Sequence, residues 1–229
     1  MPLKTATALL LIIDAQNDFC PAYSFGGERH PGGSLAVRGG CAVIEPLNEL
    51  SAAFARLGGR VAATQDWHPE GHASFASSHP GKKPGDLIDL EGAPGQALWP
   101  DHCVRGSRGA RFHAGLDLRP ASLIVRKGFR PGLDSYSAFF ENDRKTPTGL
   151  EGWMRGLGIE AVVIGGLATD YCVFFSAMDA RRLGFEVVLA EDAARGVGFP
   201  EGSVERAASE MRSAGVAFSD SRRIALGLC

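Results

Sequence analysis

Short apolar runs alternate with amphipathic stretches along the chain. The continuous apolar run at 8–14 is typical of a central parallel strand that is covered on both faces. Apolar or β-branched runs predict five further strands, at 60–64, 122–127, 160–165, 185–190 and 216–219. Helical periodicity predicts four helices between them, at 41–57, 148–157, 170–184 and 200–214. This alternation predicts an α/β fold: a doubly wound, mostly parallel six-stranded sheet with helices on both faces, in three layers.

One segment, at about 66–121, breaks this alternation because it is rich in Gly, Pro, Ser and His. Four of the six histidines fall in its first part, at positions 68, 72, 79 and 102. Irregular chain of this length inside a compact domain is usually functional or disordered. Because Trp67 and Trp99 stand beside the histidines, we interpret the segment as a functional insertion in a single domain that spans residues 1–229.

Composition narrows the class of protein. The chain has 229 residues, 45% of them hydrophobic, and a formal net charge of −2, which gives no broad electrostatic case for binding nucleic acid or membranes. Five cysteines stand at wide spacings (20, 41, 103, 172 and 229), which favours free thiols in a reducing compartment. The first apolar run is short and ends at Asp14, unlike a signal peptide. We therefore expect a cytoplasmic protein.

Cys172 lies where a strand turns into a helix. The predicted strand stops at Gly165 and Gly166, and the helical pattern begins a few residues later, so Cys172 falls in the first helical turn. Thr169 or Asp170 can cap that helix. The unpaired N–H groups and the helix dipole there favour a thiolate and predict a lowered cysteine pKa. The alternative is a small buried cysteine that only packs.

Asp14 and Lys127 also follow predicted strands. Parallel strands bring their carboxyl ends to one edge of a sheet, where open α/β folds place their chemistry. We therefore expect Asp14, Lys127 and Cys172 to meet at that edge, as a carboxylate base, an ammonium group and a thiol nucleophile. Taken singly, Asp14 also fits a turn cap and Lys127 a solvated strand end.

The insertion carries a candidate metal site. Asp66 and His68 are two residues apart, so in extended chain their side chains point the same way, and His102 follows later in the insertion. One carboxylate and two imidazoles suit Zn²⁺, Fe²⁺ or Mn²⁺ and leave open positions. The alternative is a polar surface loop whose histidines only make hydrogen bonds.

Six motifs in order resemble one known family and cover most of the chain. They lie at 13–20 (IDAQNDFC), 64–69 (TQDWHP), 98–103 (LWPDHC), 127–128 (KG), 134–139 (DSYSAF) and 166–173 (GLATDYCV). In these motifs the chain is similar to the cysteine amidohydrolases of the isochorismatase-like superfamily, and most closely to its nicotinamidase branch.

The resemblance implies hydrolysis of nicotinamide to nicotinate and ammonia through a thioester on Cys172, as in NAD salvage, with pyrazinamide as a second substrate. It implies that Asp14, Lys127 and Cys172 form a catalytic triad. It further implies one divalent ion, with Zn²⁺ expected and Fe²⁺ or Mn²⁺ as alternatives, held by Asp66, His68 and His102. The backbone N–H groups of Ala168 and Cys172 would form the oxyanion hole, after a cis peptide bond at 167–168.

By the same resemblance, Phe19, Trp99 and Tyr136 wall the substrate ring, and Gln16 belongs to the same pocket. His72 stands where some relatives recruit an additional ligand, so it is a candidate for the metal or for a contact to its ligands. The segment at 25–31 is longer than in many relatives. The expected partner is nicotinamide, with no nucleic acid and no membrane, and the chain could form a homo-oligomer.

Four alternative functions stay open at this point. The first is another amidohydrolase of the superfamily that acts on a carbamoyl or ureido substrate, and the second is isochorismatase itself. The third is a thiol redox sensor in which Cys20 or Cys103 resolves an oxidised Cys172. The fourth is a metal-binding domain without catalysis.

Overall fold

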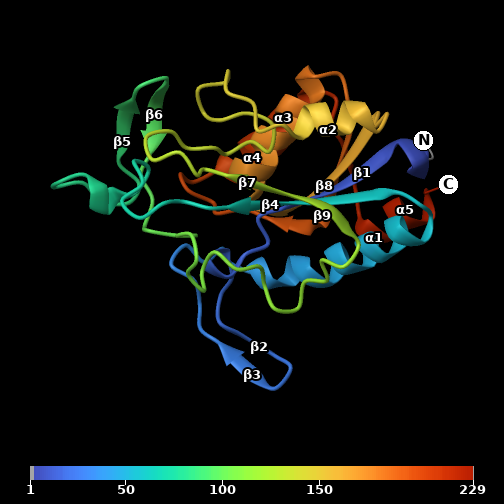
Figure 1. Ribbon diagram of the computed structural model, residues 1–229, viewed down its shortest axis with the longest axis horizontal. Coiled ribbons are helices and arrows are strands. Elements are labelled where there is room, and N and C mark those ends of the chain that lie inside the picture. The colour runs from blue at the N-terminus through green and yellow to red at the C-terminus, as the bar shows by residue number, and fades with distance from the viewer. Residues whose placement is uncertain (1–2, 229) are drawn as a thin grey trace.

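A six-stranded sheet with every pair of neighbours parallel forms the centre of the protein. Its spatial order is β10–β9–β8–β1–β4–β7 in the computed structural model, which describes residues 3–228 (Figure 1). The strands are β1 (Ala8–Ile13), β4 (Arg60–Asp66), β7 (Ala121–Lys127), β8 (Ala161–Leu167), β9 (Glu186–Arg195) and β10 (Ala217–Ser219). The predicted doubly wound sheet is confirmed. From β1 the chain winds outward in one direction to β7 and in the other to β10, so a switch point lies between β1 and β8.

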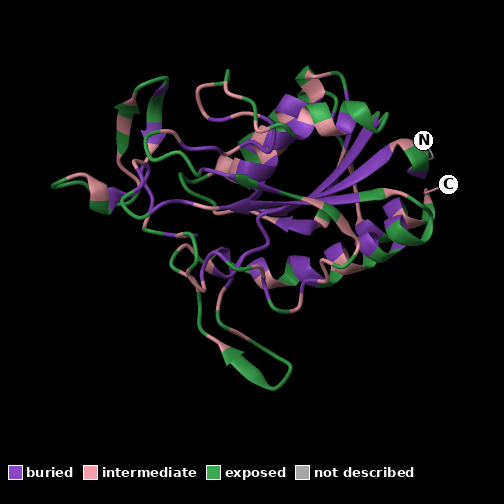
Figure 2. Cartoon of the chain, viewed as in Figure 1, coloured by how far each residue is buried: buried purple, intermediate pink, exposed green. Residues whose placement is uncertain are grey.

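Helices cover both faces of the sheet. In Figure 1, α1 (Ile44–Arg56) and α5 (Ser221–Leu226) lie on one face, and α2 (Leu150–Gly156), α3 (Phe174–Arg182) and α4 (Ser203–Ser213) lie on the other. Strand β1 shows why, since its residues are all apolar and alternate in direction. Its even-numbered residues pack with α1, and its odd-numbered leucines pack in the second core cluster. Figure 2 shows this buried layer continuing through the central strands.

Short helical turns shape the connections. Four are 3₁₀ turns: η1 (Thr5–Thr7), η2 (Asn17–Phe19), η3 (Gly40–Val43) and η4 (Ala76–Ser78). A π-helical turn, η5 (Thr169–Val173), joins β8 to α3 and carries Cys172. None of the helices in residues 3–228 combines the length and apolar character needed to cross a membrane.

Two antiparallel hairpins differ from the sequence expectation. One consists of β2 (Tyr23–Phe25) and β3 (Glu28–His30) and projects from the body of the protein (Figure 1). Its two-residue loop, Gly26–Gly27, has positive φ at both positions, which is a strong hairpin signal. The other hairpin, β5 (Leu87–Leu90) and β6 (Ala93–Ala97), lies inside the insertion, which is therefore less irregular than expected.

Other helix and strand boundaries differ from the expected ones by a few residues. The expected helix at 200–214 begins at Ser203, because Gly202 before it has a left-handed conformation that a right-handed helix cannot include. Strand β9 runs to Arg195, five residues beyond the apolar run that predicts it. The C-terminal helix α5 is too short to show helical periodicity in the sequence.

Candidate active site

Asp14, Lys127 and Cys172 meet at the carboxyl ends of the central strands. Asp14 follows β1, Lys127 ends β7 and Cys172 follows β8. Lys127 Nζ lies 2.8 Å from Asp14 Oδ2 and 3.4 Å from Cys172 Sγ. All three side chains are buried. The structure thus brings the three expected catalytic residues into one cluster beside the switch point.

Asp14 is held in an unusual backbone conformation. Its φ of 43° lies in the left-handed region, which residues other than glycine rarely adopt and which costs free energy. The Thr64 hydroxyl donates to Asp14 Oδ1 at 2.6 Å and accepts from the Asp14 N–H at 3.1 Å. Gly166 passes so close that an added Cβ would lie 2.0 Å from Ile13 O, so only glycine fits there. These contacts fix the carboxylate in the cluster.

Lys127 links the thiol to a neighbouring acidic group. Its ammonium group also lies 2.5 Å from Asp66 Oδ1 and donates to the Ser135 carbonyl at 2.9 Å. Burial alone would lower the lysine pKa, but Asp14 and Asp66 hold it well above its usual value. Lys127 is therefore a permanent positive charge between two carboxylates.

The Cys172 thiol is neutral at rest, so the expectation of a lowered pKa is wrong. Burial, and then Asp14 and Asp66, hold the pKa of Cys172 well above its usual value, although Lys127 opposes them. Burial also raises the pKa of Asp14, to about 6, against the opposing effect of Lys127. At neutral pH the carboxylate is ionised and the thiol is protonated. This is the pairing that a general base and a latent nucleophile require.

The chain around Cys172 departs from the expected capped helix. No side chain caps η5 or α3, so neither Thr169 nor Asp170 has the predicted capping role. Asp170 instead accepts hydrogen bonds from the N–H groups of Val197 and Gly198, both at 2.9 Å, and holds that loop against η5. The bond at 167–168 is cis, as the resemblance implies. The oxyanion-hole role of Ala168 and Cys172 stays a prediction.

Asp66, His68 and His102 gather beside the thiol as a metal-ligating group. Their ligand atoms all lie within 4.8 Å of one another. His68 Nδ1 donates to Gly128 O and His102 Nδ1 donates to Pro100 O, each at 2.8 Å. These bonds leave the Nε2 lone pairs of both rings free for a cation. His68 Nε2 is buried and has no hydrogen-bond partner.

The electrostatics of this group also fit a divalent cation. Against the effect of burial, Asp66 raises the pKa of His68, so a positive charge at Nε2 is favoured. Although burial opposes it, Lys127 and His68 hold the pKa of Asp66 below its usual range. Burial lowers the pKa of His102 to about 4 and keeps that imidazole neutral, as ligation requires. Gly128 leaves room for the His68 ring, since a Cβ there would lie 2.5 Å from it.

His72 lies next to this group, with both ring nitrogens engaged. Nδ1 lies 2.8 Å from Ser74 Oγ, and Nε2 lies 3.4 Å from the Leu133 carbonyl. The His72 and His68 rings are 4.4 Å apart, and the ligand atoms of His68, His72 and Asp134 lie within 4.8 Å of one another. The role of His72 as an additional metal ligand stays a prediction.

A cavity opens over the thiol and the metal-ligating group. Three of the four expected pocket residues, Phe19, Trp99 and Tyr136, line it. The Tyr136 hydroxyl accepts hydrogen bonds from Trp99 at 3.0 Å and from Gln96 at 2.8 Å, which fixes the ring. The remaining lining residues are Leu35, Asp66, His102, Asp134, Ala168, Tyr171, Cys172 and Val197.

Four of these residues were missed by sequence reasoning. Asp134 and Tyr171 stand inside the recognised motifs and could have been found there. Leu35 and Val197 stand in loops without any pattern, and only the fold brings them to the cavity.

Gln16 does not line the cavity, contrary to expectation. Its buried side chain accepts from the Asp66 N–H at 2.8 Å and donates to the Asp66 carbonyl at 2.9 Å. It also donates to the Ala110 carbonyl at 2.9 Å. Gln16 thus fixes the backbone of Asp66 from behind.

Comparison with known proteins agrees with this geometry. The family model described as "Isochorismatase domain" matches residues 8–223. The nicotinamidase of Acinetobacter baylyi is 44% identical over 215 residues, covering 94% of this chain and 93% of that protein.

Two solved structures are similar over the whole fold. PnC1 from L. infantum in complex with nicotinate has a TM-score of 0.80 and 38% identity, and the match covers 100% of this chain and 98% of that one. The pyrazinamidase of Pyrococcus horikoshii in complex with zinc has a TM-score of 0.72 and 33% identity, covering 93% of this chain and 99% of that one. The chain belongs to the isochorismatase domain family.

Proposed function

We propose that the protein is an amidohydrolase that converts nicotinamide to nicotinate and ammonia. The observation that carries the proposal is the buried contact of Lys127 with both Asp14 and Cys172, beneath a cavity beside Asp66 and His102. The similarity to nicotinamidases over nearly the whole chain supports the same substrate. In this function the chain works as one hydrolase domain, and its product nicotinate re-enters NAD synthesis.

The first half of the reaction forms a thioester. Asp14 takes the proton of the Cys172 thiol, and the sulfur attacks the carboxamide carbon of nicotinamide. Lys127 offsets the negative charge as it passes from the carboxylate to the sulfur. Backbone N–H groups of Ala168 and Cys172 stabilise the tetrahedral oxyanion, an effect typically worth about 2.7–4 kcal/mol per donor. The C–N bond then breaks, and Asp14 returns its proton to the departing ammonia.

The second half hydrolyses the thioester. Asp14, ionised again, takes a proton from a water molecule that attacks the thioester carbonyl. The C–S bond breaks, the sulfur regains its proton, and nicotinate leaves. One carboxylate thus serves both halves, which fits a pKa of about 6 for Asp14.

We propose Asp66, His68 and His102 as the ligands of one divalent ion. Zinc is the favoured ion, because the similar pyrazinamidase of Pyrococcus horikoshii was solved with zinc, and Fe²⁺ or Mn²⁺ would suit the same donors. When bound, the ion supplies a Lewis-acidic point that orients the ring nitrogen of the substrate. The protein's own part is to hold the two imidazoles through Gly128 and Pro100 and the carboxylate through Lys127 and Gln16.

The cavity suits a flat ring. Phe19, Trp99 and Tyr136 contribute aromatic side chains to its wall, and Trp99 meets Tyr171 edge to face with ring centroids 4.8 Å apart. Pyrazinamide has the same outline and keeps a nitrogen at the same ring position, so we expect it to be hydrolysed as well.

Ammonia release from three matched amides tests this proposal. Nicotinamide and pyrazinamide should both be hydrolysed by the purified, metal-loaded protein, while benzamide, which lacks the ring nitrogen, should be a much poorer substrate. Equal rates on benzamide and nicotinamide would contradict the orienting role of the ion. No release from any of the three would overturn the substrate assignment.

The rival functions make different predictions in the same assays. A carbamoyl or ureido amidohydrolase would release ammonia from N-carbamoyl compounds and leave nicotinamide intact. A redox sensor would convert Cys172 to a disulfide with Cys20 or Cys103 under mild oxidant, which mass spectrometry detects. We expect neither result.

A further inference from the structure

A second group of metal-ligating side chains lies away from the cavity. Cys20 follows η2, Cys41 lies in η3, and His113 comes from the last part of the insertion. Their ligand atoms are all within 4.8 Å of one another. Cys20 and His113 are buried, and Cys41 is half-buried, so the group is reached from one side. Three segments that are far apart in the sequence thus converge on one point.

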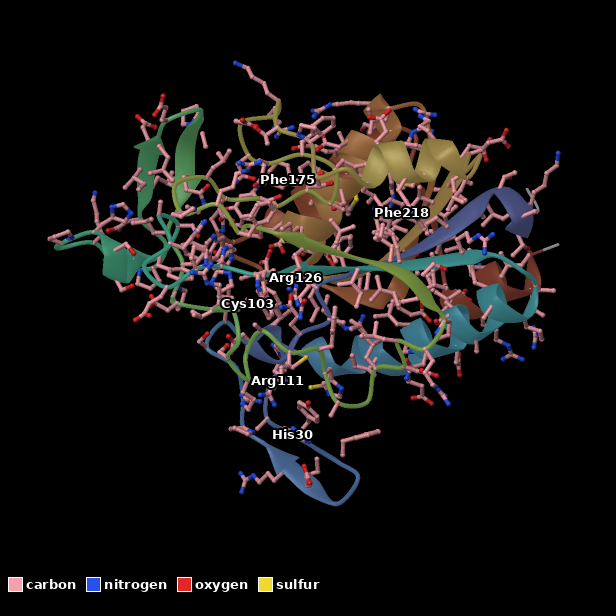
Figure 3. All side chains as sticks on the ribbon, viewed as in Figure 1. His30, Cys103, Arg111, Arg126, Phe175 and Phe218 are labelled. Carbon is pink, nitrogen blue, oxygen red and sulfur yellow. The ribbon has the colours of Figure 1, made fainter. Side chains whose placement is uncertain are left out.

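His113 has a ring nitrogen without any partner. Its side chain is more than nine-tenths buried, and Nε2 makes no hydrogen bond. The other nitrogen, Nδ1, accepts a hydrogen bond from the Gly115 N–H at 3.0 Å. Tyr23 stacks on the ring at 3.7 Å, and His30, labelled on the hairpin in Figure 3, stacks on Tyr23 at 4.5 Å. A buried polar atom without a partner costs free energy and needs an explanation, which a bound cation would supply.

The imidazole of this group is in the protonation state that a cation requires, while its two thiols must first lose their protons. Burial, aided by His30, lowers the pKa of His113 to about 4, so its imidazole is neutral at physiological pH. Burial raises the pKa values of Cys20 and Cys41, so both carry protons in the absence of a metal. A thiophilic cation displaces such protons, since thiolate is the ligating form.

We propose that Cys20, Cys41 and His113 form a second metal site, which binds a thiophilic cation of the Zn²⁺ type. Two thiolates and one imidazole are a donor set typical of zinc, with water as the fourth ligand. Zinc–sulfur and zinc–nitrogen bonds place such donors roughly 3.5–3.8 Å apart. The three ligand atoms therefore need to move by only about 1 Å to bind one ion. Ligation through Nε2 puts the ring proton on Nδ1 and ends the bond from Gly115.

The proposed site takes no part in the proposed reaction, because none of its three ligands lines the cavity. Cys20 directly follows Phe19, which lines the cavity, while Cys41 lies just ahead of α1 and His113 belongs to the insertion. A bound ion would join these three segments and stabilise the folded state by mass action. Because no residue of the site touches the reacting atoms, the proposal stands apart from the proposed function.

Counting metal ions per chain tests the proposal. The full-length reduced protein is loaded with Zn²⁺, passed through a desalting column and analysed by elemental mass spectrometry. We expect two ions per chain in the wild type, one in Cys41→Ser and one in His113→Asn. Cys103→Ser is the matched control, since Cys103 is a buried thiol in the same core cluster but outside the site, and it should keep two. Nicotinamide hydrolysis should be unchanged in Cys41→Ser.

Cobalt substitution identifies the ligands independently. Co²⁺ in this site should give a thiolate-to-metal charge-transfer band in the near ultraviolet. The band should persist in Cys172→Ala, which removes the thiol beside the other site, and disappear in Cys41→Ser. One zinc ion per wild-type chain, or no loss of zinc in Cys41→Ser, would overturn the proposal. A Cys20–Cys41 disulfide that forms in the presence of both reductant and zinc would do the same.

Discussion

Two buried thiols, one at the carboxyl edge of the sheet and one in the insertion next to His102, show what makes a cysteine reactive in this fold. Cys172 and Cys103 (labelled in Figure 3) both have pKa values well above the usual thiol value, and burial is the main cause for each. Only Cys172 lies against an ammonium group, 3.4 Å from Lys127 Nζ, and lines the cavity. Cys103 is fully buried and packs with apolar neighbours.

The comparison separates the pKa of a thiol from its reactivity. A low resting pKa is unnecessary where a base stands ready, because the proton leaves as the substrate is attacked. Asp14 and Lys127 supply that base and a compensating charge for Cys172. Cys103 shares the burial, and nearby carboxylates also raise its pKa, yet only its N–H, not its sulfur, donates to Asp18, and its sulfur makes no direct contact with an ammonium group among the described residues. The predictions below test this difference, beginning with the largest effect.

Removing each thiol in turn should give opposite results. Cys172→Ala should lower the rate of ammonia release from nicotinamide by about 10⁴-fold or more, as expected when a nucleophile is removed, while nicotinamide still binds. Cys103→Ser should keep kcat within about threefold, because that thiol takes no part in the reaction. Steady-state kinetics and calorimetric binding measure both. Substantial turnover by Cys172→Ala would exclude the covalent mechanism.

Removing the positive charge should damage both activity and stability. In the metal-free protein, Lys127→Met leaves Asp14 and Asp66 buried without a counter-charge, a loss typically worth about 3–5 kcal/mol. We also expect kcat to fall by at least about 10²-fold, since the charge passing to sulfur is no longer compensated. Urea denaturation and kinetics provide the measurements. Lys83→Met, at an exposed lysine, is the control and should change neither quantity.

The acid limb of the pH profile should follow Asp14. Since Asp14 acts as the base, kcat/KM should rise with pH as the carboxyl ionises, with a midpoint near its pKa of about 6. Thr64→Val removes the hydroxyl that donates to Asp14 Oδ1, raises that pKa and moves the limb to higher pH by up to about one unit. Thr64→Ser keeps the donor and should leave the limb in place. Superimposable profiles for the valine variant and the wild type would exclude this role of Thr64.

A buried carboxyl away from the thiol should affect stability alone. Burial raises the pKa of Glu141 to about 7, although Arg130 opposes this effect. Because the folded protein favours the neutral form, this stabilisation is present below the unfolded value of about 4.5 and is lost as the pH rises through 7. Glu141→Gln should therefore remove roughly 1–3 kcal/mol of the difference in unfolding free energy between pH 5 and pH 8. Urea titrations at both pH values measure it, and an unchanged difference would contradict the assignment.

The strands, and the clustering of Asp14, Lys127 and Cys172 at their carboxyl ends, could be predicted because local sequence marks where each strand runs and ends. An apolar run specifies a buried parallel strand, and the residue that ends such a strand must lie at the carboxyl edge. Asp14 and Lys127 were placed in this way. The histidine ligands needed more than periodicity, because their segment is irregular. Residue type suggested that His102 joins Asp66 and His68, and the motif resemblance supported that grouping.

The remaining features depend on contacts that no local pattern records. Val197 reaches the cavity because Asp170 holds its loop through two backbone hydrogen bonds. Gln16 lies in a recognised motif, yet its side chain turns toward the backbone of Asp66, 50 residues away. The pKa of Cys172 differs from the expectation because burial outweighs any effect of the helix start on the thiol.

Ammonia release from nicotinamide, before and after removal of metal by a chelator and again after Zn²⁺ is added back, tests the central claim most directly. If Cys172 attacks a substrate oriented by an ion on Asp66, His68 and His102, release should fall on chelation and return with zinc. Release that persists after complete metal removal would keep the thiol chemistry and contradict the role of the ion. No release in any metal form would contradict the assignment of nicotinamide as the substrate.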